Sequence, residues 1–108
     1  MALFEHVVLL KQDLSSSDLE SEIRNQEEII SELNGNIVSK ESWGLRNLAY
    51  PIKNNKKAFY ELMNIDLPNE NLKKINEKLN LNENIIRYIT IKVKNFEDGP
   101  SPMMKGND

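Results

Sequence analysis

The spacing between apolar residues switches repeatedly along the chain between the period of a strand and the period of a helix. Residues 3–10 carry large and β-branched apolar side chains on both faces, which predicts a strand at the centre of a sheet. Further strands are predicted over residues 37–52, 58–67 and 85–94, and helices over residues 18–33 and after Pro68. The predicted order of elements is therefore β-α-β-β-α-β.

Residues typical of caps and turns support these boundaries. Ser17 and Glu20 have the spacing of a capping box at the start of the first helix, and Asn34-Gly35 favours a left-handed stop at its end. Gly44 predicts a bulge in the long second strand. Asn54-Asn55 predicts a turn, so the second and third strands should form an antiparallel hairpin.

This order predicts an α+β, ferredoxin-like fold with a four-stranded antiparallel sheet and two helices on one face. Right-handed crossovers would leave the other face bare, as a surface for binding. Residues 1–95 are predicted to form a single domain. Residues 96–108 contain Gly99-Pro100-Ser101-Pro102 and no periodicity, which predicts a flexible C-terminal tail that orders only on a partner.

Composition excludes several classes of function. The chain has 108 residues and no cysteine, so thiolate metal sites, disulfides and cysteine nucleophiles are absent, and His6 is its single histidine. We therefore expect no metal site and no cofactor. The longest apolar run, Val7 to Leu10, is too short for a membrane span or a signal-peptide core. These features predict a protein of the cytoplasm or of an organelle interior, without membrane contact.

Charge is unevenly distributed along this chain, whose net charge is −3. Residues 1–37 hold two basic and eight acidic side chains, whereas residues 38–65 hold five basic and two acidic ones. Residues 85–95 hold three basic side chains and no acidic one. Two basic segments in an acidic chain predict a surface with one face for an anion. The alternative is that the charges alternate along solvated strands.

Several short segments resemble the bacterial small-subunit ribosomal protein six family. The longest is Trp43-Gly44-Leu45-Arg46-Asn47-Leu48-Ala49-Tyr50-Pro51-Ile52, and the others are Lys56-Lys57-Ala58, Leu62-Met63-Asn64, then Asn84, Ile86 and Arg87, and finally Ser101-Pro102-Met103 with Lys105. The resemblance extends from about Leu3 to Lys105. The chain departs from the family pattern at Ala2-Leu3, where many members carry basic residues.

This resemblance implies a structural, non-enzymatic protein of the small ribosomal subunit. Family members bind the central domain of 16S ribosomal RNA as a heterodimer with small-subunit ribosomal protein eighteen, and so support subunit assembly. We expect the isolated chain to be a monomer that binds RNA weakly, because its basic patch is small.

The candidate binding residues fall into two groups. Those predicted to contact RNA are Arg46, Lys53, Lys56, Lys57, Arg87, Trp43 and Tyr50, and those predicted to contact the partner protein are Glu5, Met103 and Lys105. Cations spaced along one surface suit phosphates, and aromatic rings beside them can stack on unpaired bases. Each has a structural alternative: a solvated hairpin for the lysines, an ion pair for Arg87, packing on its own hairpin for Trp43 and a solvent-facing role for Glu5.

Two other classes of function compete with this interpretation. A regulatory module of the same fold would form a symmetric homodimer through its sheet and would have a small-molecule pocket. An acylphosphatase-like enzyme would need a phosphate cradle, but the four glycines are scattered and form no phosphate-binding loop. His6 has no neighbour in the sequence that would make it a general base, so we expect it to be packed in the fold.

Overall fold

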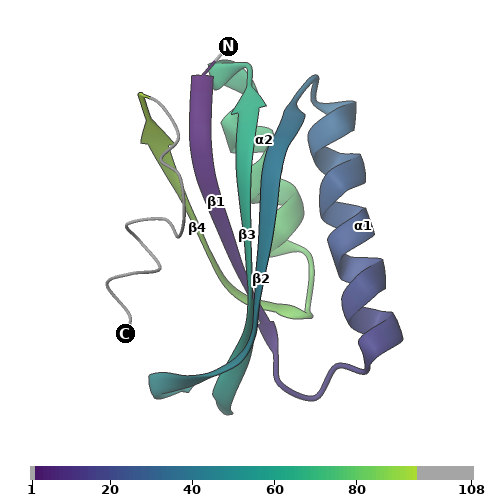
Figure 1. Ribbon diagram of the computed structural model, residues 1–108, viewed down its shortest axis with the longest axis vertical. Coiled ribbons are helices and arrows are strands. Elements are labelled where there is room, and N and C mark those ends of the chain that lie inside the picture. The colour runs from purple at the N-terminus through teal and green to yellow at the C-terminus, as the bar shows by residue number, and fades with distance from the viewer. Residues whose placement is uncertain (1, 95–108) are drawn as a thin grey trace.

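The computed structural model describes residues 2–94 and has the predicted order of elements (Figure 1). These elements are β1 (Ala2–Lys11), α1 (Ser16–Glu32), β2 (Asn36–Ile52), β3 (Asn55–Leu67), the short 3-10 helix η1 (Asn69–Asn71), α2 (Leu72–Asn80) and β4 (Ile85–Val93). The strands form one antiparallel sheet in the order β2-β3-β1-β4. The predicted ferredoxin-like fold is thereby confirmed.

Strand β1 lies in the interior of the sheet and pairs with β3 on one side and β4 on the other. Its seven residues Phe4 to Leu10 are all buried, as expected for a strand with apolar residues on both faces. Residues opposite one another in the register share a face, so Val7 lies beside Leu62 of β3 and Ile89 of β4. The alternation predicted for residues 58–67 is also present.

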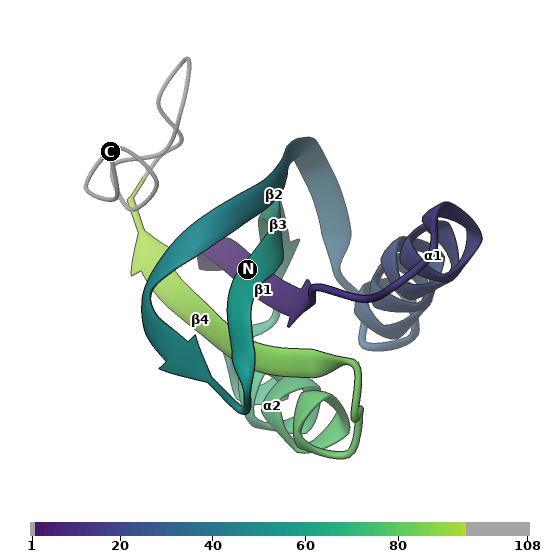
Figure 2. The same ribbon diagram turned by 90° about the horizontal axis from the view of Figure 1, so that it is seen from below.

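Both helices lie on the same side of the twisted sheet, where they cover the main core (Figure 2). The buried residues of this core include Phe4, Val8 and Leu10 of β1, Ile29 and Ile30 of α1, Met63, Ile65 and Leu67 of β3, and Ile75 and Leu79 of α2. Each helix contributes a stripe of apolar residues, because residues three or four positions apart share one helix face. Among residues 2–94, no helix is both long and apolar enough to cross a membrane.

The sheet face opposite the helices is partly covered, so the prediction that it would be bare is wrong. A second apolar cluster lies there, formed by Val7, Leu9, Ala58, Leu62 and Ile86. The partly buried residues Trp43, Leu48, Ile52 and Tyr60 pack against it. Three of them belong to β2, whose second half curves over this face of the sheet (Figures 1 and 2). The β2–β3 hairpin therefore covers part of its own sheet.

Two local predictions are corrected by the backbone. The first helix begins at Ser16, and its N-cap is Ser15, whose hydroxyl accepts a hydrogen bond from the Asp18 amide at 3.2 Å. Ser17 is already helical, so it does not cap the helix. The turn of the hairpin is formed by Lys53 and Asn54, which both have positive φ, one residue earlier than predicted. A two-residue turn of this kind matches the twist of the flanking strands.

Candidate nucleic-acid interface

The bend in the β2–β3 hairpin begins at Gly44, where the pairing register between the strands shifts. Gly44 has a φ of +73°, which glycine adopts without steric strain, and the predicted bulge is confirmed. Pairing is interrupted again between Asn47 and Ile52, so the intervening residues arch out of the ladder. This arch carries the exposed Tyr50 over the sheet face opposite the helices.

Arg46 is held close to Trp43 by two contacts. Its guanidinium carbon lies 4.8 Å from the centre of the indole ring, and its Nε donates a hydrogen bond to the Trp43 carbonyl oxygen at 3.1 Å. The electron-rich face of the ring attracts the guanidinium. The indole itself is half-buried against the second apolar cluster, which gives the arginine a fixed support.

Arg87 of β4 is joined to the arch of β2. Its Nη1 donates a hydrogen bond to the Tyr50 hydroxyl at 3.1 Å. Tyr50 is 59% exposed and Arg87 is exposed, so this contact lies at the surface. Two predicted RNA-binding residues from distant segments are thus in direct contact. The structural alternative for Arg87, an ion pair with an acidic residue, is not observed within residues 2–94.

The three lysines of the hairpin are exposed, but they do not share one face. Lys56 helps to line a shallow hollow of about 320 Å³ in the arch, together with Tyr50 and Pro51. Lys57 follows Lys56 in β3, so strand alternation places it on the helix side of the sheet. Lys53 belongs to the turn itself. The structure therefore places Lys56 beside Tyr50, which contacts Arg87, and places Lys57 on the other side of the sheet.

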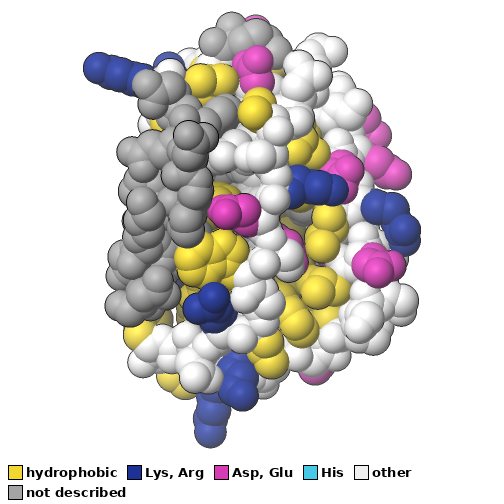
Figure 3. Space-filling view, in the orientation of Figure 1, with side chains coloured by type: hydrophobic (Ala, Val, Ile, Leu, Met, Phe, Trp, Pro, Cys, Tyr) yellow, Lys and Arg dark blue, Asp and Glu magenta, His cyan; other side chains and the backbone are white. Residues whose placement is uncertain are grey.

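Basic side chains are present at the hairpin end of the molecule. Several Lys and Arg side chains lie at the lower end of the view in Figure 3, where Figure 1 places the hairpin, and others lie at the upper left and on the right. Acidic side chains lie mainly over α1, on the right of the same view. One lysine of β2 is directed toward that helix: Lys40 forms an ion pair with Glu27 at 3.0 Å. It is therefore not part of the basic end.

The remaining sheet face beside β4 carries the predicted partner residue Glu5. Glu5 is only 6% exposed and lies opposite Ile91 of β4, so the alternative that it faces solvent is not observed. Ile91 and Ile89 are 43% and 37% exposed, a large exposure for isoleucine on a strand. Strand alternation in the sequence could have identified them as a surface. The predicted contacts Met103 and Lys105, and the predicted tail 96–108, lie outside the described residues.

His6 is completely buried on the helix side of the sheet, as predicted. Its Nε2 lies 3.4 Å from Oε1 of Gln26 in α1, and its Nδ1 lies 2.8 Å from the hydroxyl of Thr90 in β4. Nε2 is assigned as the donor because the carboxamide oxygen can only accept, so Nδ1 accepts from Thr90. Burial lowers the pKa of His6 to about 4, although the bond to Gln26 opposes this shift. His6 is thus a neutral core residue.

Glu61 is the other titratable group with a perturbed pKa. It lies on β3 and is 7% exposed, and its carboxylate accepts a hydrogen bond from the Ser42 hydroxyl at 2.7 Å. Burial raises its pKa, while the bond from Ser42 and the charge of Lys40 act in the opposite direction. Neither Glu61 nor His6 is among the residues around the arch. Within residues 2–94, no group of three or more acidic, histidine or cysteine side chains could hold a metal ion.

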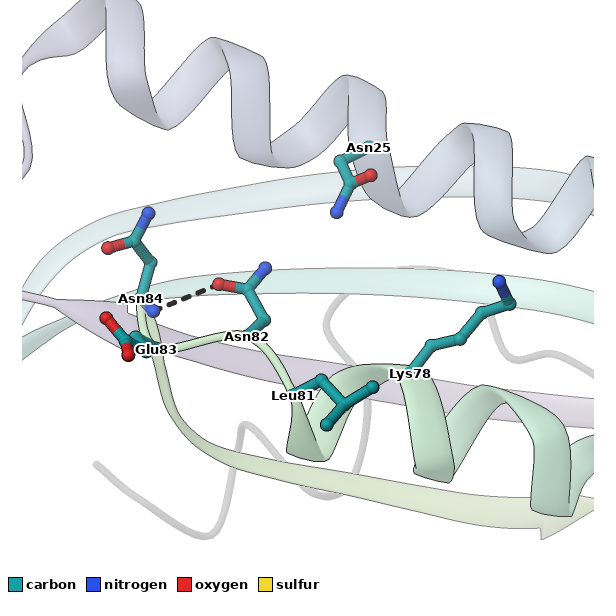
Figure 4. Close-up of a pocket in the computed structure, with 6 residues that line it drawn as sticks. All are labelled: Asn25, Lys78, Leu81, Asn82, Glu83 and Asn84. Atoms are coloured by element: carbon teal, nitrogen blue, oxygen red, sulfur yellow. Dashed lines mark hydrogen bonds between the residues drawn. The ribbon is translucent and has the colours of Figure 1, made fainter.

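A second hollow, of about 430 Å³, lies between α1 and the segment joining α2 to β4 (Figure 4). Its lining includes Asn25, Asn82 and Asn84, and Figure 4 shows the Asn84 amide bonded to the Asn82 side chain. The side-chain amides of Asn82 and Asn84 donate to the two carboxylate oxygens of Glu22 in α1. These bonds connect the helix to the loop, so the side chains of Asn82, Asn84 and Glu22 stabilise the fold.

Exposed cations beside aromatic rings are the residue types with which proteins contact phosphates and unpaired bases. The sequence model of the ribosomal protein S6 family matches residues 3–92. The small ribosomal subunit protein bS6 of Zymomonas mobilis is 43% identical over the whole chain, which covers 87% of that protein. The protein of the same name from Rickettsia prowazekii is 42% identical over 97% of this chain and 87% of its own length. The chain therefore belongs to the ribosomal protein S6 family.

A solved structure supports the fold independently. The crystal structure of 30S ribosomal protein S6 from Thermotoga maritima matches with a TM-score of 0.82 at 22% identity, over 85% of this chain and 87% of that one. Membership makes the chain a structural protein of the bacterial small ribosomal subunit, located in cytoplasmic ribosomes. It is not an enzyme, which confirms the prediction and removes the acylphosphatase alternative.

Proposed function

We propose that this chain binds the central domain of 16S ribosomal RNA together with small-subunit ribosomal protein eighteen, and so stabilises an RNA junction during subunit assembly. The observation that carries the proposal is the contact of Arg87 with Tyr50 in the arch of the β2–β3 hairpin, where Lys56 lies beside the same tyrosine. Arg87 bonds to Tyr50, and Tyr50 and Lys56 line the same hollow. Cations from two distant segments thereby form one surface, as binding to a phosphate backbone requires.

The same surface suits an RNA in which bases are unpaired. Tyr50 presents an exposed aromatic ring beside a lysine, so a base can stack while the ammonium group meets a neighbouring phosphate. The acidic helix α1 lies away from this end and would be repelled by the RNA (Figure 3). Because few cations act in a chain of net charge −3, RNA affinity of the chain alone should be low.

The exposed isoleucines of β4 support a protein partner on the adjacent face. Ile89 and Ile91 form an apolar strip beside the carboxylate of Glu5, and this strip lies next to Arg87 along β4. A basic partner protein seated there would cover the apolar surface, and its own cations would extend the RNA-binding surface. Met103 and Lys105 are proposed to contribute to the same contact from the end of the chain. We expect a monomer in the absence of this partner.

The test is a titration of a central-domain 16S RNA fragment at several salt concentrations, with and without protein eighteen. Wild-type chain should bind strongly only with the partner. Replacing Arg46, Lys56 and Arg87 together by alanine should weaken binding and reduce the steepness of its salt dependence, since fewer counterions are released.

A matched control removes the same charge elsewhere. Lys73, Lys74 and Lys78 are exposed on α2, which covers the opposite sheet face. Their triple alanine variant should bind as the wild type does. Equal losses for both triple variants would show that net charge, rather than this surface, determines affinity. Tight, salt-resistant binding by the lone chain would contradict the cooperative mechanism, and a tight homodimer would instead favour the regulatory module.

A further inference from the structure

The two arginines of the basic surface are each in contact with an aromatic residue of β2. Trp43 contacts Arg46 through its ring and its carbonyl oxygen, and Tyr50 contacts Arg87 through its hydroxyl. Trp43 lies at the bulge of β2, directly before Gly44, and Tyr50 lies in the arch that follows. At two separate positions, therefore, an aromatic residue of β2 contacts an arginine, which points to a shared role for the two aromatic residues.

We propose that Tyr50 is a positioning residue, which sets the orientation of the Arg87 guanidinium for a phosphate before RNA arrives. This inference rests on the proposed RNA-binding function and assigns Tyr50 a role other than base stacking alone. Arg87 is on a strand and Tyr50 is on an arch, so their bond also fixes the arch relative to β4. Within residues 2–94, Arg87 makes no other side-chain hydrogen bond or ion pair.

The physical reason is the entropy of a long side chain. An arginine on an exposed strand samples many rotamers, and fixing it on a phosphate loses that freedom. A bond to Tyr50 restricts the guanidinium in advance, so less freedom remains to be lost on binding. The bond uses Nη1, and a guanidinium has five N–H donors, so further donors remain for the bidentate geometry that phosphate favours. Tyr50 therefore raises affinity without contributing charge.

The salt dependence of RNA binding distinguishes the role of Tyr50 from that of Arg87. Tyr50→Phe retains the ring and every charge but removes the hydroxyl. We expect it to weaken binding of the 16S fragment, in the presence of protein eighteen, by about three- to tenfold. The slope of log affinity against log salt should stay unchanged because the arginine still meets its phosphate. Arg87→Ala should instead reduce both affinity and slope, the latter by about one unit.

A double mutant completes the test. If Tyr50 acts through Arg87, the variant with both substitutions should bind no more weakly than Arg87→Ala alone. Additive losses would overturn the proposal and assign Tyr50 an independent contact with RNA. Tyr60→Phe is the matched control, since Tyr60 belongs to the same hairpin, packs on the second apolar cluster and makes no side-chain hydrogen bond within the described residues. It should leave binding unchanged, and an equal loss would overturn the proposal because the effect would then not depend on the bond to Arg87.

Failure of the positioning role differs from failure of the proposed function. If wild-type chain with protein eighteen does not bind the fragment, the proposed function itself is wrong. If wild type binds and Tyr50→Phe binds equally well, only the positioning role is wrong. Side-chain NMR of Arg87 gives a readout without RNA: its guanidinium signals should shift and its order should fall in Tyr50→Phe, and unchanged signals would also overturn the proposal.

Discussion

His6 shows how a single buried residue makes stability depend on pH. Its pKa is about 4 in the folded chain and near 6.5 in the unfolded one, so the unfolded state binds the proton more readily. Stability is therefore fully present above the unfolded value and falls as pH decreases toward 4. Protonation would place a charge in the core beside Gln26 and Thr90, whose bonds are arranged for the neutral ring.

This difference predicts that the free energy of unfolding falls by about 2 kcal/mol between pH 7 and pH 5 through His6 alone. Urea denaturation at both pH values would measure it in wild type and in His6→Gln, which cannot titrate. The two proteins are compared by the difference between their pH dependences, because the contributions of other titratable groups, such as Glu61, are the same in both. Parallel pH dependences would show that His6 is not buried in its neutral form.

At the scale of single elements, the start of α1 distinguishes two neighbouring serines. Ser15 caps the helix through its bond from the Asp18 amide, whereas Ser17 lies inside the first turn. Ser15→Ala should destabilise the protein by about 1 kcal/mol because it leaves a helix N–H without its side-chain partner. Ser17→Ala should change stability much less. Chemical denaturation of both variants checks this, and a larger loss for Ser17→Ala would restore the capping box suggested by the sequence.

The bulge at Gly44 in β2 is a second place where the local backbone conformation affects the stability of the protein. A Cβ at Gly44 would meet no atom within 4 Å, so Gly44→Ala would create no clash. The φ of +73° alone should cost about 1 kcal/mol. Gly44→Asn should lose less, since asparagine tolerates left-handed backbone better than alanine. Thermal unfolding of the pair measures the difference, and equal losses would point to a cause other than φ.

For the whole molecule, the sheet face opposite the helices divides into a core and a surface. Leu62 is 2% exposed within the second apolar cluster, whereas Ile91 on the same face lies at the surface. Leu62→Ala should destabilise the fold by about 3 kcal/mol because it leaves a cavity. Ile91→Ala should leave stability nearly unchanged and weaken association with protein eighteen. Denaturation and a pairwise binding assay separate these effects, and the reverse pattern would contradict the proposed partner surface.

Local sequence patterns were sufficient for the order of elements and for the faces of each strand. The alternation in residues 58–67 assigns Met63 to one core and Leu62 to the other, because side chains on a strand alternate whatever surrounds them. The bulge at Gly44 was predictable for a similar reason, since glycine marks an irregular backbone. Sequence also proposed the basic and aromatic residues of the hairpin as candidates, although not the contacts among them.

Contacts between distant segments could not be obtained from the sequence. The bond between Tyr50 and Arg87 depends on how far the hairpin bends over the sheet, and this bend is the sum of the sheet twist, the bulge at Gly44 and the arch. The covered part of the sheet face has the same origin. Period and composition determined which residues belong to each element and face, because both are local. Only the tertiary structure determined which of them meet, because small backbone rotations accumulate over many residues.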